Sequence, residues 1–573
     1  MVVKYVVSPH SRRGTYPNIT SALRAFSALQ AVSRRRRSAV VEIAAGRYEE
    51  GLVACGDVRL VATEGPGSVE VHLARGTVLE TYGSVQVEGL VLAGRDAEQD
   101  AVACAQGSLV LDRVEVRTPG GVGTHARPNT QVTLRDSTFL HGRTLFTAST
   151  GTIERCRFTD AADNAIAAIE GAQLSLRSSR VEGSRIHGVR VCDARAEVTD
   201  CELTGTGHAA LMADTRARLV VADCAITAVH GEGIMFIEQS RGSVDRTRVT
   251  DARHGLGAGS GADPVVRDCV FTACRDTGII VETDARGRYE DCRVVDARNV
   301  GVLSARGGAP EVVRCQVSGG NVGIAVTEGS RGRFSHVRIE DLPNSALRVM
   351  DGSKGTFEHG RVDRCTLGLD TNGDGGTTAD LTDLVFSEVE TAVTALGRSR
   401  VTLRGVAAER VAVGFFAGEE AQAHLHDCTA TTVRVGGAVV AGKGKVFAKK
   451  LTVRGSEGNG LSVAESGYLN VADGEFTDCA TAGAVFADES SGRLVDCAVN
   501  GTQGVAVIHN GRVELVGLRT SLKVVDKTVR TVDQPTVIHV DGPYIAGSVY
   551  KSQLAWNNDS VTQNQSNEDG RTT

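Results

Sequence analysis

A short segment at residues 370–374 carries side chains that suit a hard cation. Asp370, Asn372 and Asp374 alternate along it and a glycine follows. Three oxygen ligands in this pattern can be brought onto one concave loop, which is the arrangement of many calcium sites. The match is incomplete, because Leu381 stands where a bidentate acid is expected. Two interpretations stay open: a calcium site, the only cofactor that the sequence suggests, or a plain Asn/Gly turn.

Charged residues also recur at one point of a repeating pattern. The acidic members are Asp193, Asp214, Glu238, Glu282, Glu328, Asp351, Glu419, Glu465 and Glu489. A basic residue often follows within three positions, as at Arg195, Arg216, Arg241, Arg286, Arg331 and Lys354. Alternating signs at solvent turns are typical of a solvated face with weak salt bridges. The alternative interpretation is a groove for a polyionic partner or a polysaccharide.

Cysteines form a third regular feature, because most of them are separated by multiples of 22 or 23 residues. The segments are Asp200-Cys201-Glu202-Leu203, Asp223-Cys224-Ala225-Ile226, Asp268-Cys269-Val270-Phe271, Asp291-Cys292-Arg293-Val294 and Arg314-Cys315-Gln316-Val317. Disulfides, a metal site and plain packing are the competing explanations. Stacked side chains that point the same way cannot wrap a tetrahedral metal, and other repeats carry Val, Leu, Ser or Thr in this position, so packing is favoured.

Such a repeat requires elements that return to the same place. A second ladder runs in phase with the cysteines, through Gly188-Val189, Gly233-Ile234, Gly278-Ile279, Gly301-Val302, Gly323-Ile324, Gly460-Leu461 and Gly504-Val505. Each repeat therefore holds at least two short strands separated by turn residues. Coils that stack on one another pair these strands in parallel and close a common core. We predict an all-β chain with a right-handed parallel β-helix of about eighteen coils over residues 40–525.

The ends of the chain differ from the repeats. Asn18 is a plausible N-cap, and the apolar residues after it have helical spacing, so residues 1–39 are predicted to form a strand and a capping helix over the first coil. Residues 526–573 form a separate extension that is expected to be partly disordered and flexible. The whole chain carries 63 basic and 69 acidic residues, a balance that favours neither nucleic acid nor a membrane as partner. With no export signal or membrane span recognised, a cytoplasmic location is expected.

The helix, the run Ile43-Ala44-Ala45-Gly46-Arg47-Tyr48-Glu49-Glu50 and the two ladders resemble the pectate-lyase-like right-handed β-helix superfamily of carbohydrate-binding and sugar-hydrolase repeats. The resemblance covers residues 14–525 and implies the fold more strongly than an activity. Active sites of such enzymes lie on an outer face, with carboxylates, Arg or Lys, and often calcium. The Asp-Asp and Arg-Ile-Lys motifs of polygalacturonase-type members are missing, and Arg253-His254-Gly255 matches only a fragment of their Gly-His-Gly motif.

The C-terminal extension has its own composition. The stretch 547–567 alternates apolar and amide residues, carries few charges and contains the only Trp of the chain. In-register stacking of such residues favours cross-β assembly, and the stretch resembles a bacterial amyloid signalling motif seeded by NLR-type receptors. The residues expected to self-assemble are Gln553, Trp556, Asn557, Gln563, Asn564 and Gln565. The alternative is a disordered hydrophilic tail.

These observations lead to two functional hypotheses. The leading one is a non-enzymatic cytoplasmic scaffold whose β-helix face binds a protein partner or a polymeric ligand, with a tail that mediates amyloid-type signalling. The alternative is a polysaccharide-active enzyme, a lyase, hydrolase or esterase of the pectate-lyase-like superfamily. The sequence shows no complete catalytic constellation, so the enzymatic question is left open and no catalytic residue is assigned.

Overall fold

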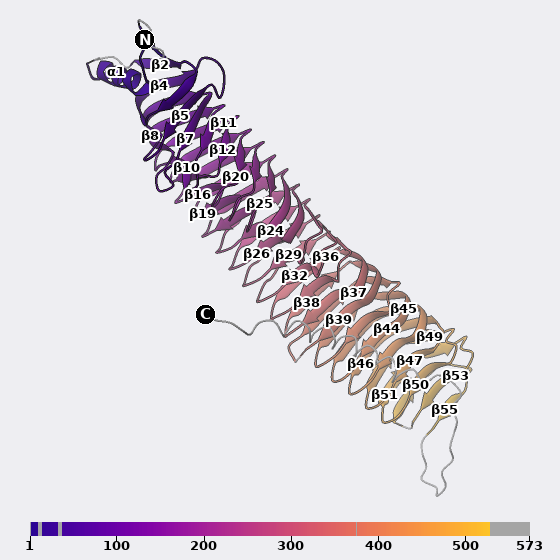
Figure 1. Cartoon of the computed structure of the whole chain (residues 1–573). Helices are drawn as coiled ribbons and strands as arrows, with labels where there is room; N and C mark the ends of the chain where they lie inside the picture. The colour runs from indigo at the N-terminus through magenta and orange to yellow at the C-terminus, as the bar shows by residue number, and fades with distance from the viewer. Residues whose placement is uncertain (1, 10–13, 33–36, 374, 511, 528–573) are drawn as a thin grey trace, which may run out of the picture. The chain divides into compact units, whose positions relative to one another are not determined.

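The computed structural model describes residues 2–9, 14–32, 37–373, 375–510 and 512–527. In these residues the chain forms one helix, α1 (Ile19–Val32), and 55 strands that pair in parallel, giving an all-β solenoid of about 21 turns. The predicted fold class is confirmed (Figure 1). The turns outnumber the predicted eighteen because long strands near the N-terminus hide the short-strand repeat; these are β4 (Leu52–Ala62), β6 (Leu79–Glu88) and β8 (Val102–Asp112).

The chain divides into two compact units. The first contains residues 1–370 and 377–380, and the second contains residues 371–376 and 381–573. In the second unit long strands replace several separate short ones, because β45 (Gln422–Val440) pairs with both β46 (Lys445–Ser456) and β47 (Asn459–Val463). No helix in the described part of the chain is long and apolar enough to cross a bilayer.

The first unit begins with a capped edge. Strand β1 (Val2–Val7) pairs in parallel with β2 (Ser38–Ile43), and α1 contacts both strands and β4. Asn18 caps the helix, since its Oδ1 accepts a hydrogen bond of 2.8 Å from the backbone N–H of Ser21. The Glu50 carboxylate accepts two further N–H groups of the first turn, and the buried Phe26 anchors the helix on the core.

A typical coil of the first unit holds three strands. One such coil contains β20 (Arg195–Thr199), β21 (Glu202–Thr204) and β22 (Leu211–Asp214). In each strand side chains alternate between the core and solvent, as in β20, where Ala196 and Val198 are buried. The strands that carry the site described below form one surface, here called the groove sheet. Its strands are β17 (Gln173–Arg177), β20, β23 (Arg218–Ala222), β25 (Arg241–Asp245), β27 (Asp263–Arg267), β30 (Arg288–Glu290), β33 (Glu311–Val313), β36 (Arg331–Ser335) and β38 (Lys354–Glu358).

The cysteine ladder is part of the core. All 14 cysteines are free, and Cys201, Cys224, Cys269, Cys292 and Cys315 are buried, which confirms packing as their role. Each of these thiols donates a hydrogen bond to a backbone carbonyl two residues earlier, for example Cys269 to Arg267 at 3.1 Å. The residue before the thiol turns the chain with positive φ, such as 54° at Asp200, a conformation that Asp adopts more readily than most residues. This explains why Asp-Cys recurs along the sequence.

Candidate functional site

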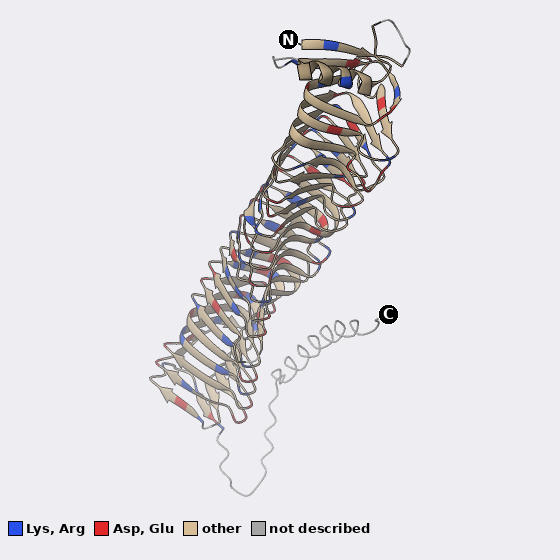
Figure 2. Ribbon diagram, turned by 90° about the vertical axis from the view of Figure 1, so that its left-hand side faces the viewer, with Lys and Arg blue, Asp and Glu red and all other residues tan. Residues whose placement is uncertain are grey.

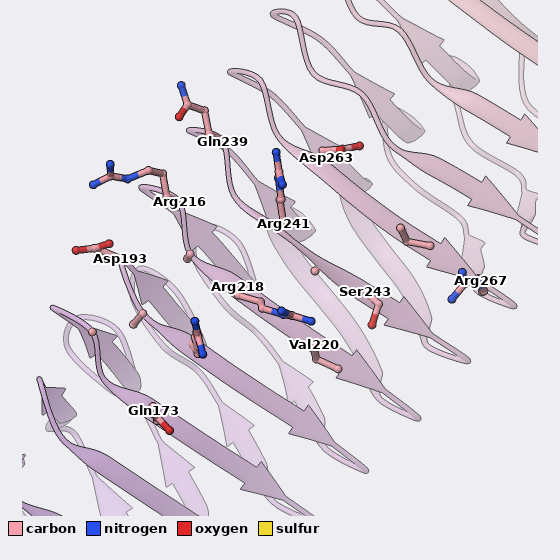
Figure 3. A pocket seen from close by; sticks show the side chains of 16 residues that line it. Gln173, Asp193, Arg216, Arg218, Val220, Gln239, Arg241, Ser243, Asp263 and Arg267 are labelled. Carbon is pink, nitrogen blue, oxygen red and sulfur yellow. The ribbon is translucent and has the colours of Figure 1, made fainter.

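A groove of about 1090 Å³ opens on the first unit over five strands of the groove sheet and the turns that precede them. Figure 3 shows Gln173, Arg218, Arg241 and Asp263 projecting on the open side from β17, β23, β25 and β27. Basic side chains dominate this lining. The charged and amide residues that line the groove are Gln173, Asp193, Arg195, Arg216, Arg218, Gln239, Arg241, Asp263 and Arg267.

The first residues of the groove-sheet strands stand in one column. Parallel register pairs Gln173 with Arg195, Arg195 with Arg218, Arg218 with Arg241, and Arg241 with Asp263. Neighbouring strands lie about 4.8 Å apart, so three guanidinium groups follow one another at the spacing of a single coil. We call the column of first residues, Gln173, Arg195, Arg218, Arg241 and Asp263, the basic column.

These three arginines differ from most arginines around them because their charge is not neutralised. Arg195, Arg218 and Arg241 are exposed, and none forms a salt bridge with any residue in the described part of the chain. Elsewhere on the groove sheet charges are paired: Arg177 of β17 lies 3.3 Å from Glu197 of β20, and Arg288 of β30 lies 2.7 Å from Glu311 of β33. The basic column is therefore available for an external anion.

Paired charges on the same sheet show what the basic column lacks. Hydrogen bonds from Arg314 and Arg288 hold the pKa of Glu290 below its usual range. An arginine whose carboxylate partner is fixed in this way offers little to a ligand, because the ligand would have to replace that partner. Figure 2 shows that basic and acidic residues are interleaved along the coils.

The floor of the groove depends on one glycine. A Cβ at Gly242 would lie 1.7 Å from the carbonyl oxygen of Leu219, and its φ of 155° belongs to a region that other residues avoid. Gly242, which lines the groove, therefore lets β25 approach β23 closely.

Toward the N-terminus the groove continues as a neutral surface. A hollow of about 680 Å³ shares Gly171 and Gln173 with the basic part. Its lining is rich in hydroxyl, amide and glycine groups: Gly83, Ser84, Gly107, Ser108, Asn129, Thr130, Gln131, Ser149 and Thr150. Such groups donate and accept hydrogen bonds without charge. Together the two parts offer uncharged partners at one end and cations at the other, across several successive coils.

Sequence analysis found this surface only in part. Arg195, Arg216 and Arg241 were noted as a charged stripe, but Arg218 was not. The stripe was attributed first to weak salt bridges, and for the basic column this attribution is wrong because the column has no such pairs among the described residues. A simple signal could have identified Arg218: it stands 23 residues after Arg195 and 23 before Arg241.

The two predicted calcium ligands that the structure describes, Asp370 and Asn372, do not line the groove. Asp370 and Asn372 belong to β39 (Arg361–Asn372), Asp370 in the first unit and Asn372 in the second, while Asp374 lies outside the described residues. Asp370 is buried, and its Oδ2 lies 3.2 Å from Nε of Arg348, which already supplies a positive charge. Within the described ranges, no group of three potential metal ligands is present.

The partial Gly-His-Gly motif lies on a different strand, β26 (Arg248–Ala258). His254 is 9% exposed, and its Nε2 stands 3.9 Å from Oδ2 of Asp276. Burial lowers the pKa of His254 despite the nearby carboxylates. This residue does not line the groove. The predicted self-assembly residues Gln553, Trp556, Asn557, Gln563, Asn564 and Gln565 lie outside the described residues.

Comparison with known proteins gives likenesses of fold. No curated protein matches the sequence. Among solved structures, a pectin methylesterase from Aspergillus niger has 13% identity, with a TM-score of 0.29 over 37% of this chain and 84% of that one. The PL6 family alginate lyase AlyGC has 8% identity and a TM-score of 0.31 over 91% and 99%. A catalytic domain of GH87 α-1,3-glucanase in complex with nigerose has 9% identity and a TM-score of 0.28 over 59% and 64%.

These comparisons contradict the leading functional hypothesis of a non-enzymatic scaffold. The solved structures with a similar fold are named as an esterase, a lyase and a glucanase, the classes of the enzymatic alternative. At these identities and TM-scores the likeness assigns no residue and no substrate. Both must be argued from the groove itself.

The family is shown by the sequence. The family model described as "Right handed beta helix region" matches residues 187–332, 258–378 and 367–518, which together span 187–518 and cover more than half of the 573 residues. The matched region includes Arg195, Arg218 and Arg241. The chain belongs to the right handed beta helix region family.

Proposed function

We propose that this chain is a polysaccharide-active enzyme whose substrate is an acidic polysaccharide, bound lengthwise across the coils of the groove sheet. The observation that carries the proposal is the basic column, in which Arg195, Arg218 and Arg241 follow one another one coil apart without a carboxylate partner in the described chain. Guanidinium groups donate bidentate hydrogen bonds to carboxylate and sulfate groups, which makes them suited to such a polymer.

The local charge, not the charge of the whole chain, favours an anionic substrate. The formal net charge is −6, so the protein as a whole would repel a polyanion weakly. Attraction must therefore come from groups at short range, since exposed charges further apart than about 10 Å are screened at ordinary ionic strength. The groove supplies such groups.

The shape and lining of the groove favour a polymer of sugars. The basic part and the neutral part share Gly171 and Gln173, so one ligand can contact both. Hydroxyl and amide side chains in the neutral part match the hydroxyl groups of sugars. No aromatic residue is present among the described lining residues, which argues against stacked nucleic acid bases as the ligand.

Among the reactions of polysaccharides, elimination fits the groove better than hydrolysis. Hydrolases of sugars use two carboxyl groups roughly 5–9.5 Å apart. Asp193 and Asp263 belong to coils separated by three steps, which corresponds to about 14 Å along the column. In elimination a base removes the C–H proton next to the uronate carboxyl group, a C=C bond forms, the glycosidic C–O bond breaks, and the leaving sugar oxygen takes a proton from water. Cations neutralise the uronate and stabilise the negative charge that develops on it. Arg218 and Arg241 are placed for that role.

Asp263 is the acidic member of the basic column and is the described carboxylate best placed to accept that proton. It lies next to Arg241 in register, is exposed and forms no salt bridge within the described residues. Asp263→Asn should therefore lower kcat strongly and change the affinity for substrate little, because the amide keeps the size of the side chain but cannot act as a base.

The direct test uses a panel of acidic and neutral polysaccharides with two readouts, ultraviolet absorbance of an unsaturated product and release of reducing ends. Arg218→Ala combined with Arg241→Ala should weaken binding of the acidic polymer by about 2 kcal/mol, roughly thirtyfold. Arg185→Ala combined with Arg248→Ala removes two exposed charges outside the groove lining and serves as the matched control. Equal binding by both double variants, or a preference for neutral polymers, would refute the proposal.

A further inference from the structure

The basic column continues beyond the groove. Register pairs Val265 of β27 with Arg288 of β30, Arg288 with Glu311, and Glu311 with Arg333. Counted two residues back from these pairs, the same column passes from Asp263 to Arg286 and Ala309, which precede β30 and β33, and then to Arg331. The pairing of β36 with β38 extends it to Lys354. The backbone bonds agree, since the N–H of Arg286 donates to Ala262 and that of Lys354 donates to Ser330.

These additional cations resemble the arginines of the groove in their exposure and in the lack of a described salt-bridge partner. Arg286, Arg331 and Lys354 are exposed, and none makes a salt bridge with a residue that the structure describes. Two acids of the adjacent turns already share a cation, because Arg306 lies 3.5 Å from Glu282 and 3.3 Å from Glu328.

The extension has a definite length. From Gln173 to Lys354 the column takes eight steps between adjacent strands, which amounts to about 38 Å at about 4.8 Å per step. The groove covers only the first part, from Gln173 to Arg267. A short oligosaccharide can fill the groove without reaching Arg331 or Lys354, whereas a long chain that follows the column reaches both.

We infer that Arg286, Arg331 and Lys354 form an exosite that holds the part of an acidic polysaccharide lying outside the groove, so that the protein selects long chains. The inference rests on the proposed function, since it assumes that the ligand of the groove is an acidic polymer. Each added contact is intramolecular once the groove is filled, so weak surface contacts add to the affinity without a new association step. A sugar of an extended chain advances by about one coil spacing, and the full column therefore accommodates roughly eight sugars.

The column favours a glycan over a single-stranded nucleic acid for a structural reason. Its members stand one coil apart, the cations are interrupted by Asp263 and Ala309, and the column contains no aromatic side chain. Proteins that bind single-stranded nucleic acid without sequence preference usually add stacking platforms to their basic grooves. A polynucleotide of matched length is nevertheless an informative competitor in the test.

The experiment measures binding of acidic oligosaccharides of increasing defined length by calorimetry with the full-length protein. Wild-type affinity should rise up to roughly eight sugars and then level off. The variant Arg331→Ala combined with Lys354→Ala should bind a tetrasaccharide like the wild type, but should lose about two- to thirtyfold in affinity for chains that span the column. The double variant at Arg185 and Arg248 is the charge-matched control.

The outcomes separate the two proposals. If no oligosaccharide of any length binds, the proposed function fails. If short oligosaccharides bind but affinity already levels off at about four sugars, or if the Arg331 and Lys354 variant weakens all lengths equally, the groove stands and the exosite is refuted. Tighter binding of the polynucleotide than of the oligosaccharides would overturn the assignment to a glycan.

Discussion

The glycines of the second ladder, such as Gly278 and Gly301, allow a direct test of how closely the coils stack. Gly278 is a buried residue of β29 (Thr277–Val281) and stands next to Gly301 in the following coil. A Cβ at Gly278 would lie 2.6 Å from the carbonyl oxygen of Gly301 and 2.3 Å from Cγ1 of Val294. Both distances are far shorter than an ordinary van der Waals contact, and the first involves backbone that a strand ladder holds in place. Gly278→Ala must therefore push adjacent coils apart.

The expected cost follows from this geometry. Overpacking by one methyl group usually costs about 1–3 kcal/mol, and the upper end applies here because a backbone atom blocks relief. Gly259→Ala is the matched control, since its Cβ would meet Cγ2 of Ile237 at an ordinary 3.6 Å and its φ is not positive. Because stability in a solenoid depends on interfaces between neighbouring repeats, the damage should be local at first.

The assay combines urea unfolding followed by circular dichroism with limited proteolysis mapped by mass spectrometry. Gly278→Ala should lower the unfolding midpoint and create new cleavage sites in the coils around residue 278, while Gly259→Ala should behave like the wild type. Equal midpoints and identical cleavage maps for the two variants would refute the reasoning, because close backbone approach would then not limit the residue at this position.

Three further predictions concern single side chains. The Arg314 guanidinium holds the pKa of Asp291 below its usual range, so this pair stabilises the fold above about pH 4 and its contribution is lost as the pH falls further; urea midpoints should decline more steeply there than in Asp291→Asn. Burial raises the pKa of Cys156 to about 12, so a thiol reagent should modify the half-buried Cys55 in the folded protein and reach Cys156 only after unfolding, as peptide mapping would show. The buried hydroxyl of Tyr289 has no hydrogen-bond partner in the described chain, so Tyr289→Phe should leave the unfolding midpoint unchanged or raise it by the equivalent of about 1 kcal/mol; a clear decrease would show that the hydroxyl is satisfied.

The sequence alone was enough to predict the features that depend on equivalent residues recurring once in every coil. Because parallel coils keep equivalent residues in register, a spacing of 22 or 23 residues was enough to predict that Cys269, Cys292 and Cys315 stack and that Gly278 and Gly301 are neighbours. The N-cap at Asn18 was also predictable, because capping depends on residues three positions apart. All of these neighbours are either close in the sequence or separated by one repeat of 22 or 23 residues.

Only the tertiary structure decided which charges are free. Arg241 and Arg246 stand five residues apart in the same coil, yet Arg246 lies 2.7 Å from Asp223 and Arg241 has no salt bridge within the described residues. Whether a charged side chain forms a salt bridge depends on the face of the coil from which it projects and on the residue that the previous coil places beside it. The composition of the chain reveals neither. The basic column could be listed from the sequence, but its availability to a ligand follows from the folded arrangement, in which none of its arginines forms a salt bridge with a described residue.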